Sequence, residues 1–330
     1  MRGLNHGPQR KNRRDSREFR PVPRKIFRLA SNFPPLTGLF RSSHSFPMLT
    51  PAPDSWTVFE AAHLLNRAGF GGSPAEIKSF HALGRTKAVD SLLNPGEPVD
   101  AIAPPEWSQP EKALEMFQAH REATREAVEK AKSMPTFEGS QVRRAVLKKY
   151  QRLRNDLGRE AEEWWMGKIL ATQAPLREKM TLFWHDHFAT SFQKVKQPAM
   201  LVRQNEMFRE HAFGDFKALT HGVAKDPAMM FYLDSQNSKK GSPNENFARE
   251  VMELFTLGEG HYSEQDIREA ARAFTGYQFN RSTGKVIHNK RQWDNTDKTV
   301  FNQAGPHDGQ AVIDLIFKQD QPARFLSTKI

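Results

Sequence analysis

Apolar residues recur every three or four positions through most of the chain beyond residue 56, which is the period of an amphipathic helix. Two stretches begin with a capping box, in which Ser or Thr is followed three residues later by Glu: Thr57 with Glu60, and Ser73 with Glu76. The pattern predicts a series of helices, expected at residues 57–68, 73–83, 87–93, 175–184, 198–211, 215–224 and 243–257, after residue 263 and from residue 309.

Residues 111–172 contain two longer helical stretches of a different composition. Residues 111–133 are charged and rich in Ala, without a strong apolar stripe, and a Pro-rich connector at 94–110 precedes them. Residues 140–172 resume the helical period through Val142 and Val146. Helices without a wide apolar stripe bury little surface, so we expect an antiparallel charged hairpin that projects from the rest of the domain.

Residues 277–303 break the helical period. Three short segments that begin at Tyr277, Lys285 and Thr299 are rich in aromatic and β-branched residues, with Gly and Asn between them. This pattern predicts a small β-meander or an ordered loop insertion. The expected fold is therefore mainly α: an irregular multi-helix body with a projecting helical hairpin and a small β insertion, in a single domain at 48–330.

The net charge of +11 is concentrated at one end of the sequence. Residues 1–47 contain 11 Lys and Arg against two acids and lack periodic apolar positions, so we expect a disordered basic tail. Three explanations stay open: translation that starts at Met48, a functional arm that binds nucleic acid or anionic lipid, and an inert extension. The remaining residues are nearly neutral, which argues against nucleic-acid binding by the domain.

The sequence contains no Cys, so disulfides, thiol catalysis and Cys-ligated zinc or iron–sulfur centres are excluded. No stretch reaches the roughly 20 apolar residues that a membrane-spanning helix requires. The Arg-rich start is not followed by the apolar segment of a secretory signal peptide. The last residues, 323–330, have the character of a helix without a stop signal, so we expect the C-terminus to be truncated.

The first candidate site is the pair His185 and His187 in a helix that contains Phe183 and Trp184. Imidazole binds zinc, iron and copper, but residues two apart on a helix point about 160° apart and cannot hold one ion unless the helix ends or unwinds there. His187 falls on the apolar stripe and His185 on the opposite side. The alternatives are a buried, hydrogen-bonded His187 with a surface His185, and a catalytic or ligand role for His187.

The second candidate site follows the expected capping box Ser242 and Glu245. Glu250 and Glu253 share one helix face, where two carboxylates can hold a divalent cation or act as an acid/base pair. Arg249 can bind an anionic substrate through both guanidinium nitrogens. The alternative is a row of ordinary ion pairs that join Arg249 to Glu245 and Glu253.

The chain resembles a known bacterial family over about residues 56–330, the domain-of-unknown-function family numbered 1800. The runs that carry the resemblance include His63–Gly71, Trp164–Trp165, Leu176–Phe188, Arg203–Asn205, Asp226–Met229, Asn244–Glu250, Leu254–Gly258, Tyr262–Ile267 and Ala270–Gly276. The resemblance implies a mainly helical protein whose relatives are often exported and are encoded beside a second family, related to sulfatases and phosphatases. It implies no activity, cofactor or catalytic residue.

Three functions remain open. The first is an interaction or scaffold partner of a neighbouring exported protein. The second is a metal-dependent or acid/base enzyme with its site between the His187 helix and the helix of Glu250 and Glu253. For that site, the candidate catalytic residues are His187, Glu250, Glu253 and Arg249, and the candidate metal ligands are His185, His187, Glu250 and Glu253. The third, which the charge distribution disfavours, is nucleic-acid binding through the basic tail.

Overall fold

A computed structural model describes residues 55–96, 102–280 and 283–330, and the expected basic tail at 1–47 lies outside these ranges. The described chain is mainly helical, as predicted. Its first part contains α1 (Val58–Ala68), α2 (Pro74–Ala82), α3 (Arg85–Leu93), the 3₁₀ turn η1 (Glu106–Ser108), α4 (Pro110–Lys132) and α5 (Thr136–Ala171).

The remaining helices are shorter and follow one another closely. They are α6 (Pro175–His187), α7 (Phe192–Val195), α8 (Pro198–Glu210), α9 (Phe216–Ala224), α10 (Pro227–Tyr232), η2 (Ser235–Asn237), α11 (Asn246–Glu250), the π-helix η3 (Val251–Thr256), α12 (Glu264–Ala273), α13 (Gly309–Ile316) and α14 (Gln321–Lys329). None of the described helices combines the length and the apolarity that crossing a membrane requires.

Local sequence signals set several of these helix starts. The predicted capping box of α1 is present, because Thr57 accepts a hydrogen bond from the Glu60 amide and Glu60 accepts one from the Thr57 amide. The box of α2 is present in the same form. The expected box at Ser242 is absent, and α11 begins only at Asn246.

The reason for the late start of α11 lies in its asparagines. Asn244 and Asn246 both donate side-chain hydrogen bonds to the Leu233 carbonyl, at 3.4 and 3.1 Å, and Ser238 accepts one from the Asn244 amide. Asn side chains that bond to nearby backbone compete with helix formation. These bonds hold the segment before Asn246 in a loop, although its residue spacing matches a capping box.

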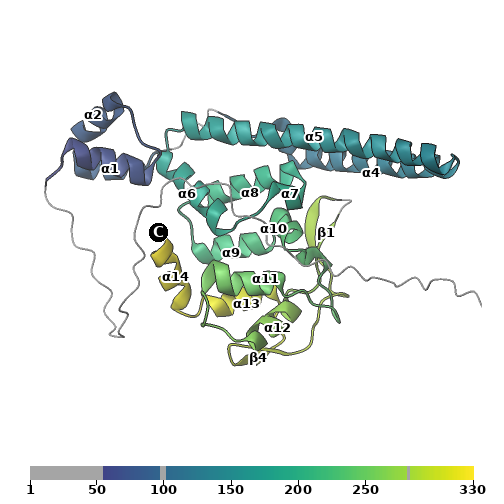
Figure 1. The fold of residues 1–330 in the computed structure, drawn as a ribbon. Coiled ribbons are helices and arrows are strands. Elements are labelled where there is room, and N and C mark those ends of the chain that lie inside the picture. The colour runs from purple at the N-terminus through teal and green to yellow at the C-terminus, as the bar shows by residue number, and fades with distance from the viewer. Residues whose placement is uncertain (1–54, 97–101, 281–282) are drawn as a thin grey trace, which may run out of the picture. The chain divides into compact units, whose positions relative to one another are not determined.

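Helices α4 and α5 lie side by side along their length, joined by a short turn (Figure 1). The turn is tight, because a side chain at Gly139 would place its Cβ only 2.5 Å from the Ala131 carbonyl oxygen. The Tyr150 hydroxyl donates to the Ala119 carbonyl, and the rings of His120 and Tyr150 lie 4.0 Å apart. Ala127 is the one fully buried residue of α4, as expected from its weak apolar stripe.

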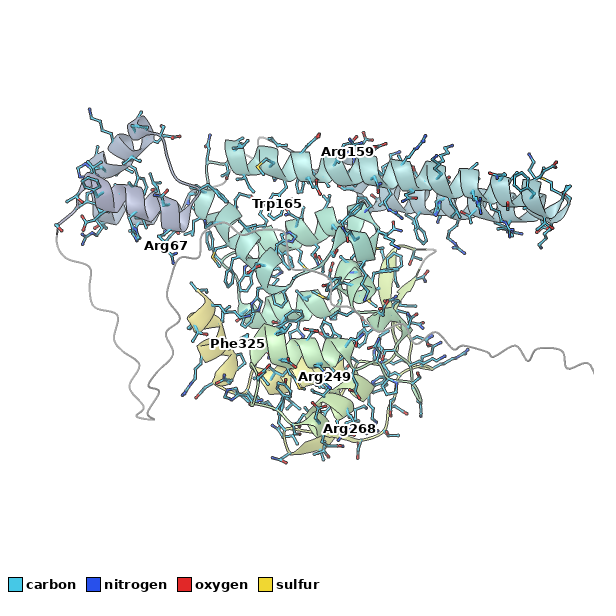
Figure 2. The ribbon with its side chains drawn as sticks, in the orientation of Figure 1. Arg67, Arg159, Trp165, Arg249, Arg268 and Phe325 are labelled. Carbon is cyan, nitrogen blue, oxygen red and sulfur yellow. The ribbon has the colours of Figure 1, made fainter. Side chains whose placement is uncertain are left out.

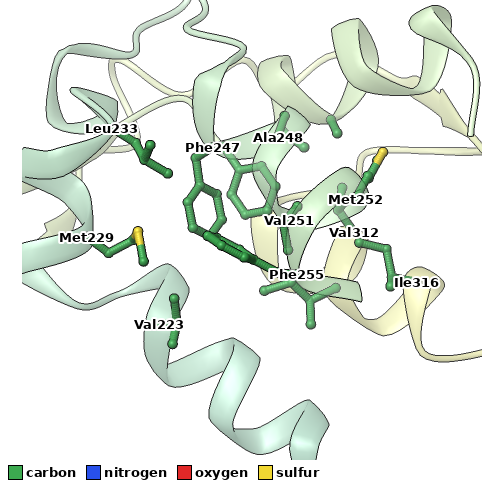
Figure 3. Close-up of a cluster of buried hydrophobic side chains, with 14 of the residues drawn as sticks. Val223, Met229, Leu233, Phe247, Ala248, Val251, Met252, Phe255, Val312 and Ile316 are labelled. Atoms are coloured by element: carbon green, nitrogen blue, oxygen red, sulfur yellow. The ribbon is translucent and has the colours of Figure 1, made fainter. Parts of the chain in front are cut away.

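The main core lies between α6, α8, α9 and the helices that follow, and Figure 3 shows the part to which α9, α10, α11, the π-helix and α13 contribute. Several of these helices, and the residue directly after α6, contribute its largest fully buried side chains, among them Phe188, Phe208, Leu219, Met229, Met252, Ile267 and Ile313. Rings gather at its centre: Phe188 packs against Trp184, Phe208, Phe216 and Phe255, with centroids 5.0–6.3 Å apart. This aromatic cluster fixes α6 against the π-helix.

The β insertion consists of two separate hairpins. Strand β1 (Tyr277–Asn280) pairs antiparallel with β2 (Lys285–His288), as the predicted segments indicated. The third predicted segment forms β3 (Lys298–Val300), which pairs with β4 (Gln303–Gly305) and not with the first two strands. The β3 strand lies against α12, where the Asp266 carboxylate accepts from the Phe301 amide at 2.7 Å.

Candidate functional site

The helix that carries Glu250 and Glu253 changes its winding midway. Five residues of ordinary α-helix, α11, continue without a break into six residues of π-helix, η3. The wider winding is closed by the Leu257 amide, which donates to the Met252 carbonyl five residues earlier, at 2.8 Å. Short π-helical segments occur frequently at functional sites. Here the carbonyls of Leu254 and Phe255 accept hydrogen bonds from other helices.

His187 at the end of α6 is one of these donors. Its Nε2 lies 2.8 Å from the Phe255 carbonyl oxygen, so Nε2 carries the proton, and its Nδ1 lies 3.5 Å from the Lys329 Nζ. Lys329 also donates to the Leu254 carbonyl at 3.0 Å. Burial and then the Lys329 charge lower the pKa of His187 to about 4. The partner of His187 is therefore a backbone carbonyl, which agrees with the expected alternative of a buried, hydrogen-bonded His187.

His185 was expected at the surface as the alternative to a ligand role, and this expectation is wrong. Its ring packs 4.6 Å from Trp165 and 4.8 Å from Phe208. Burial, followed by the charge of Arg209, lowers its pKa to about 4. The reason is that α6 is covered on two sides: the His187 side faces the main core, and the His185 side faces α5 and α8.

The contacts of Asn205 determine the tautomer of His185. Asn205 Oδ1 accepts a hydrogen bond from Arg209 at 2.7 Å, so the Nδ2 end of the amide faces His185, 2.9 Å from its Nε2. An amide NH₂ can only donate. His185 Nε2 must therefore accept, which places the ring proton on Nδ1 and keeps the imidazole neutral.

A buried ion pair holds Arg209 in this position. The Glu178 carboxylate binds the Arg209 guanidinium through both oxygens, at 2.5 and 3.0 Å, and both side chains are at most 8% exposed. Trp165, marked in Figure 2, donates its indole N–H to the same carboxylate at 3.3 Å. Arg209 also bonds Glu206. The spacing of Glu178 and His185, two turns apart on one face of α6, was a weak signal for this cluster in the sequence.

A second polar chain runs beside the first. Thr190 donates to Gln204 at 2.7 Å, and Gln204 donates to the fully buried Asp226 at 2.6 Å. The same Asp226 oxygen caps α10 by accepting from the Met229 amide. Burial raises the pKa of Asp226 to about 6 despite these hydrogen bonds. This chain of hydrogen bonds ties α8 to the start of α10.

The carboxylates of the second candidate site have different surroundings. Glu253 accepts a hydrogen bond from the Tyr262 hydroxyl at 2.8 Å. Burial, with the nearby charge of Glu253, raises the pKa of the half-buried Glu250. Arg249 (Figure 2) pairs with Glu264 at 2.8 Å and with Glu245 at 3.4 Å, so the expected pair with Glu245 is present.

His185 and His187 contact different parts of the molecule. His185 contacts α5 and α8, whereas His187 contacts the π-helix and α14. Among the residues that the structure describes, no three His, Asp or Glu side chains gather closely enough to hold a metal ion. The arrangement therefore adds no support to a metal site made from His185, His187, Glu250 and Glu253.

The buried ion pair predicts a large stability effect. Replacing Glu178 by Gln removes the buried counter-ion of Arg209 and leaves only the partly exposed Glu206 paired with it, and breaking such a buried pair costs about 3–5 kcal/mol. Chemical denaturation should show this loss in the free energy of unfolding. The matched control is Glu129→Gln, which breaks the exposed pair with Lys132 and should cost at most about 1 kcal/mol. Equal effects of the two substitutions would contradict the structural role of Glu178.

The two histidines predict a pH dependence of stability. Both have a folded pKa of about 4, below the ordinary value of 6.5, so their contribution is complete above pH 6.5 and is lost as the pH falls toward 4. We expect the melting temperature to drop across this window, and His185→Gln or His187→Gln to make the drop shallower. The same substitution at the exposed His63 is the control. If neither His185→Gln nor His187→Gln changes the dependence of the melting temperature on pH, the two histidines are not its cause.

The comparisons with known proteins agree with the resemblance noted in the sequence. The chain matches the family described as "Protein of unknown function (DUF1800)" over residues 63–330. No curated protein and no solved structure matches it. Because the match covers most of the sequence and includes α6, α8 and the π-helix, the chain belongs to the DUF1800 family.

Proposed function

We propose that this protein is an interaction module, which binds an acidic, amphipathic segment of an exported protein encoded beside it. The observation that carries the proposal is an open apolar groove between α4, α5 and the segment 196–199. The groove has a volume of about 160 Å³, and its apolar lining comes from Trp107, Met116, Phe117, Leu147, Leu153 and Leu157. A second hollow shares Phe117 and Ala199 with it and continues toward Phe279.

The exposure of the groove residues supports a docking role. Leu147 is 56% exposed and Leu153 is 40% exposed, on a helix that is otherwise covered with charged side chains. Large apolar side chains that gather on a polar surface mark sites of interaction. An amphipathic helix binds such a groove through apolar residues spaced three and four apart.

The charge around the groove favours an acidic partner. Six Lys and Arg residues and no acid lie between residues 139 and 155 of α5. The near-neutral charge of residues 48–330 conceals this local excess. Arg154 lines the groove, as does Lys196 from the loop after α7. The apolar lining favours a protein segment over a phosphate backbone.

Substitution in the groove tests this function. Leu147→Asp places a carboxylate in the apolar lining and should weaken binding of the neighbouring exported protein at least about tenfold, as measured by calorimetry. Leu170→Asp changes a residue of the same helix that is 79% exposed and lies outside the groove, and it should leave the affinity unchanged. Equal affinities of the two variants, or no binding by the wild type, would contradict the proposal.

A second candidate function is acid/base catalysis at Glu250 and Glu253. The observation in its favour is the raised pKa of Glu250 beside Glu253, on a helix that becomes π-helical at the same point. A carboxylic acid whose pKa is raised can act as a proton donor, and a second carboxylate beside it can act as the acceptor. His187 stays a candidate member of this site, although its Nε2 proton is held by Phe255.

The carboxylate pair makes a separate prediction. Because the folded pKa of Glu250 is raised, ionisation of this group costs stability as the pH rises above its ordinary value of 4.5. Glu250→Gln should therefore raise the melting temperature at pH 7 relative to wild type, and less so at pH 4. When Glu253 is already replaced by Gln, Glu250→Gln should raise the melting temperature by less, because the repulsion between the two carboxylates has been removed. The same gain in both backgrounds would show that the two carboxylates do not interact.

A further inference from the structure

A half-open cavity lies between α5, α6 and α8, apart from the groove described above. Its volume is about 270 Å³, and Trp164, Trp165, His185, Thr190, Phe192 and Asn205 contribute to its lining. An apolar cavity of about 150 Å³ is large enough to hold benzene. The cavity therefore has room for a compound with one ring and a substituent.

Trp164 supplies an unused hydrogen-bond donor in this lining. The residue is 7% exposed, and its buried Nε1 has no hydrogen-bond partner among the described residues. Lys168 and Arg209 lie over the indole ring, 5.6 and 5.5 Å from its centroid. Because these cations occupy the face of the ring, the N–H at its edge is the polar group left to meet a ligand. An indole N–H can only donate.

His185 supplies the second donor. The bond from Asn205 to Nε2 places the ring proton on Nδ1, and the hydrogen bond that the ring makes within the described part of the chain is at Nε2. The ion pair between Glu178 and Arg209 holds Asn205, so this tautomer is fixed before any ligand arrives. Preorganised donors of this kind bind an acceptor without the cost of ordering the side chain.

The charges around the cavity favour a neutral ligand. Lys168 and Arg209 are balanced by Glu178 and Glu206, at N–O distances of 4.0 Å or less. Glu162, which is exposed, also belongs to the lining and repels an anion. A compound that fits must therefore offer a neutral acceptor, such as a carbonyl oxygen, with an apolar ring to contact Trp165 and Phe192.

We propose that this cavity binds a small neutral compound that carries one ring and a carbonyl group. The carbonyl oxygen accepts a hydrogen bond from Trp164 Nε1, and His185 Nδ1 is the second donor of the site. The proposal is independent of the groove on the α4–α5 hairpin. It assigns a ligand-binding role to α6 on the side opposite the His187 contact with the π-helix.

Benzamide is a suitable probe, because it combines one ring with a neutral carbonyl. We expect it to bind the full chain with a dissociation constant of about 1 mM, as is usual for a ligand of this size. In a ¹H–¹⁵N spectrum it should shift the indole signal of Trp164 and leave that of Trp107, which donates to Glu160, unchanged. Toluene lacks the acceptor and benzoate is an anion, so each should bind at least about fivefold more weakly than benzamide.

Two substitutions separate the hydrogen bond from general packing. Trp164→Phe removes the N–H and should weaken benzamide binding about fivefold to tenfold. Trp293→Phe removes another buried, unpartnered indole N–H that lies outside the cavity, and it should leave the affinity unchanged. The change of the Trp164 indole signal on adding benzamide is measured with the wild-type protein, so the test holds even if Trp164→Phe fails to fold. No shift at Trp164, or equal binding of toluene and benzamide, would overturn the proposal.

Discussion

The buried ion pair between Glu178 and Arg209 is the constraint on which the interior between α5, α6 and α8 depends. It joins α6 to α8 through two oxygens of one carboxylate, and the same carboxylate accepts from Trp165 on α5. The planar guanidinium has further donors, which reach Asn205 and Glu206. Desolvating two charges is costly, so such a pair persists only where its remaining hydrogen-bonding groups are satisfied, as they are here.

The consequences of this pair extend along α6. Arg209 fixes the Asn205 amide, and Asn205 fixes the tautomer of His185 in the cavity wall. Two residues farther on, His187 is held by an unrelated group, the Phe255 carbonyl of the π-helix. The two histidines of one short motif are therefore neutral for different reasons. Helix α6 lies between the aromatic core and a mostly apolar, ligand-sized cavity whose wall includes His185 and Asn205.

The sequence predicted the parts of this fold that depend on local contacts. Thr57 and Ser73 start their helices as expected, because a capping box is closed within four residues. The apolar stripe of α6 placed His187 in the core correctly. The expectation that His185 lies at the surface was wrong, because Glu178 and His185 on the opposite face of α6 are buried against partners 13 to 31 residues away in the chain. No periodicity reveals such a pairing in advance.

The π-helix was hidden from the sequence for a related reason. Its residues have an ordinary amphipathic spacing, and its wider turn is stabilised by contacts with His187 and Lys329, which are distant in the chain. The candidate carboxylates Glu250 and Glu253 were predicted on one face. Burial, followed by the charge of Glu253, raises the pKa of Glu250, and the second cause agrees with that spacing. The sequence thus indicated that Glu250 and Glu253 can act together, whereas contacts with residues distant in the chain determine how each carboxylate is surrounded.

The tautomer of His185 is the most direct test of this account, because it depends on every link from Glu178 to the cavity. Long-range ¹H–¹⁵N correlation spectra distinguish a proton on Nδ1 from one on Nε2 and identify the charged ring. At about pH 6 the account predicts a neutral His185 with its proton on Nδ1, because its pKa lies near 4. A proton on Nε2, or a charged imidazolium at that pH, would contradict it.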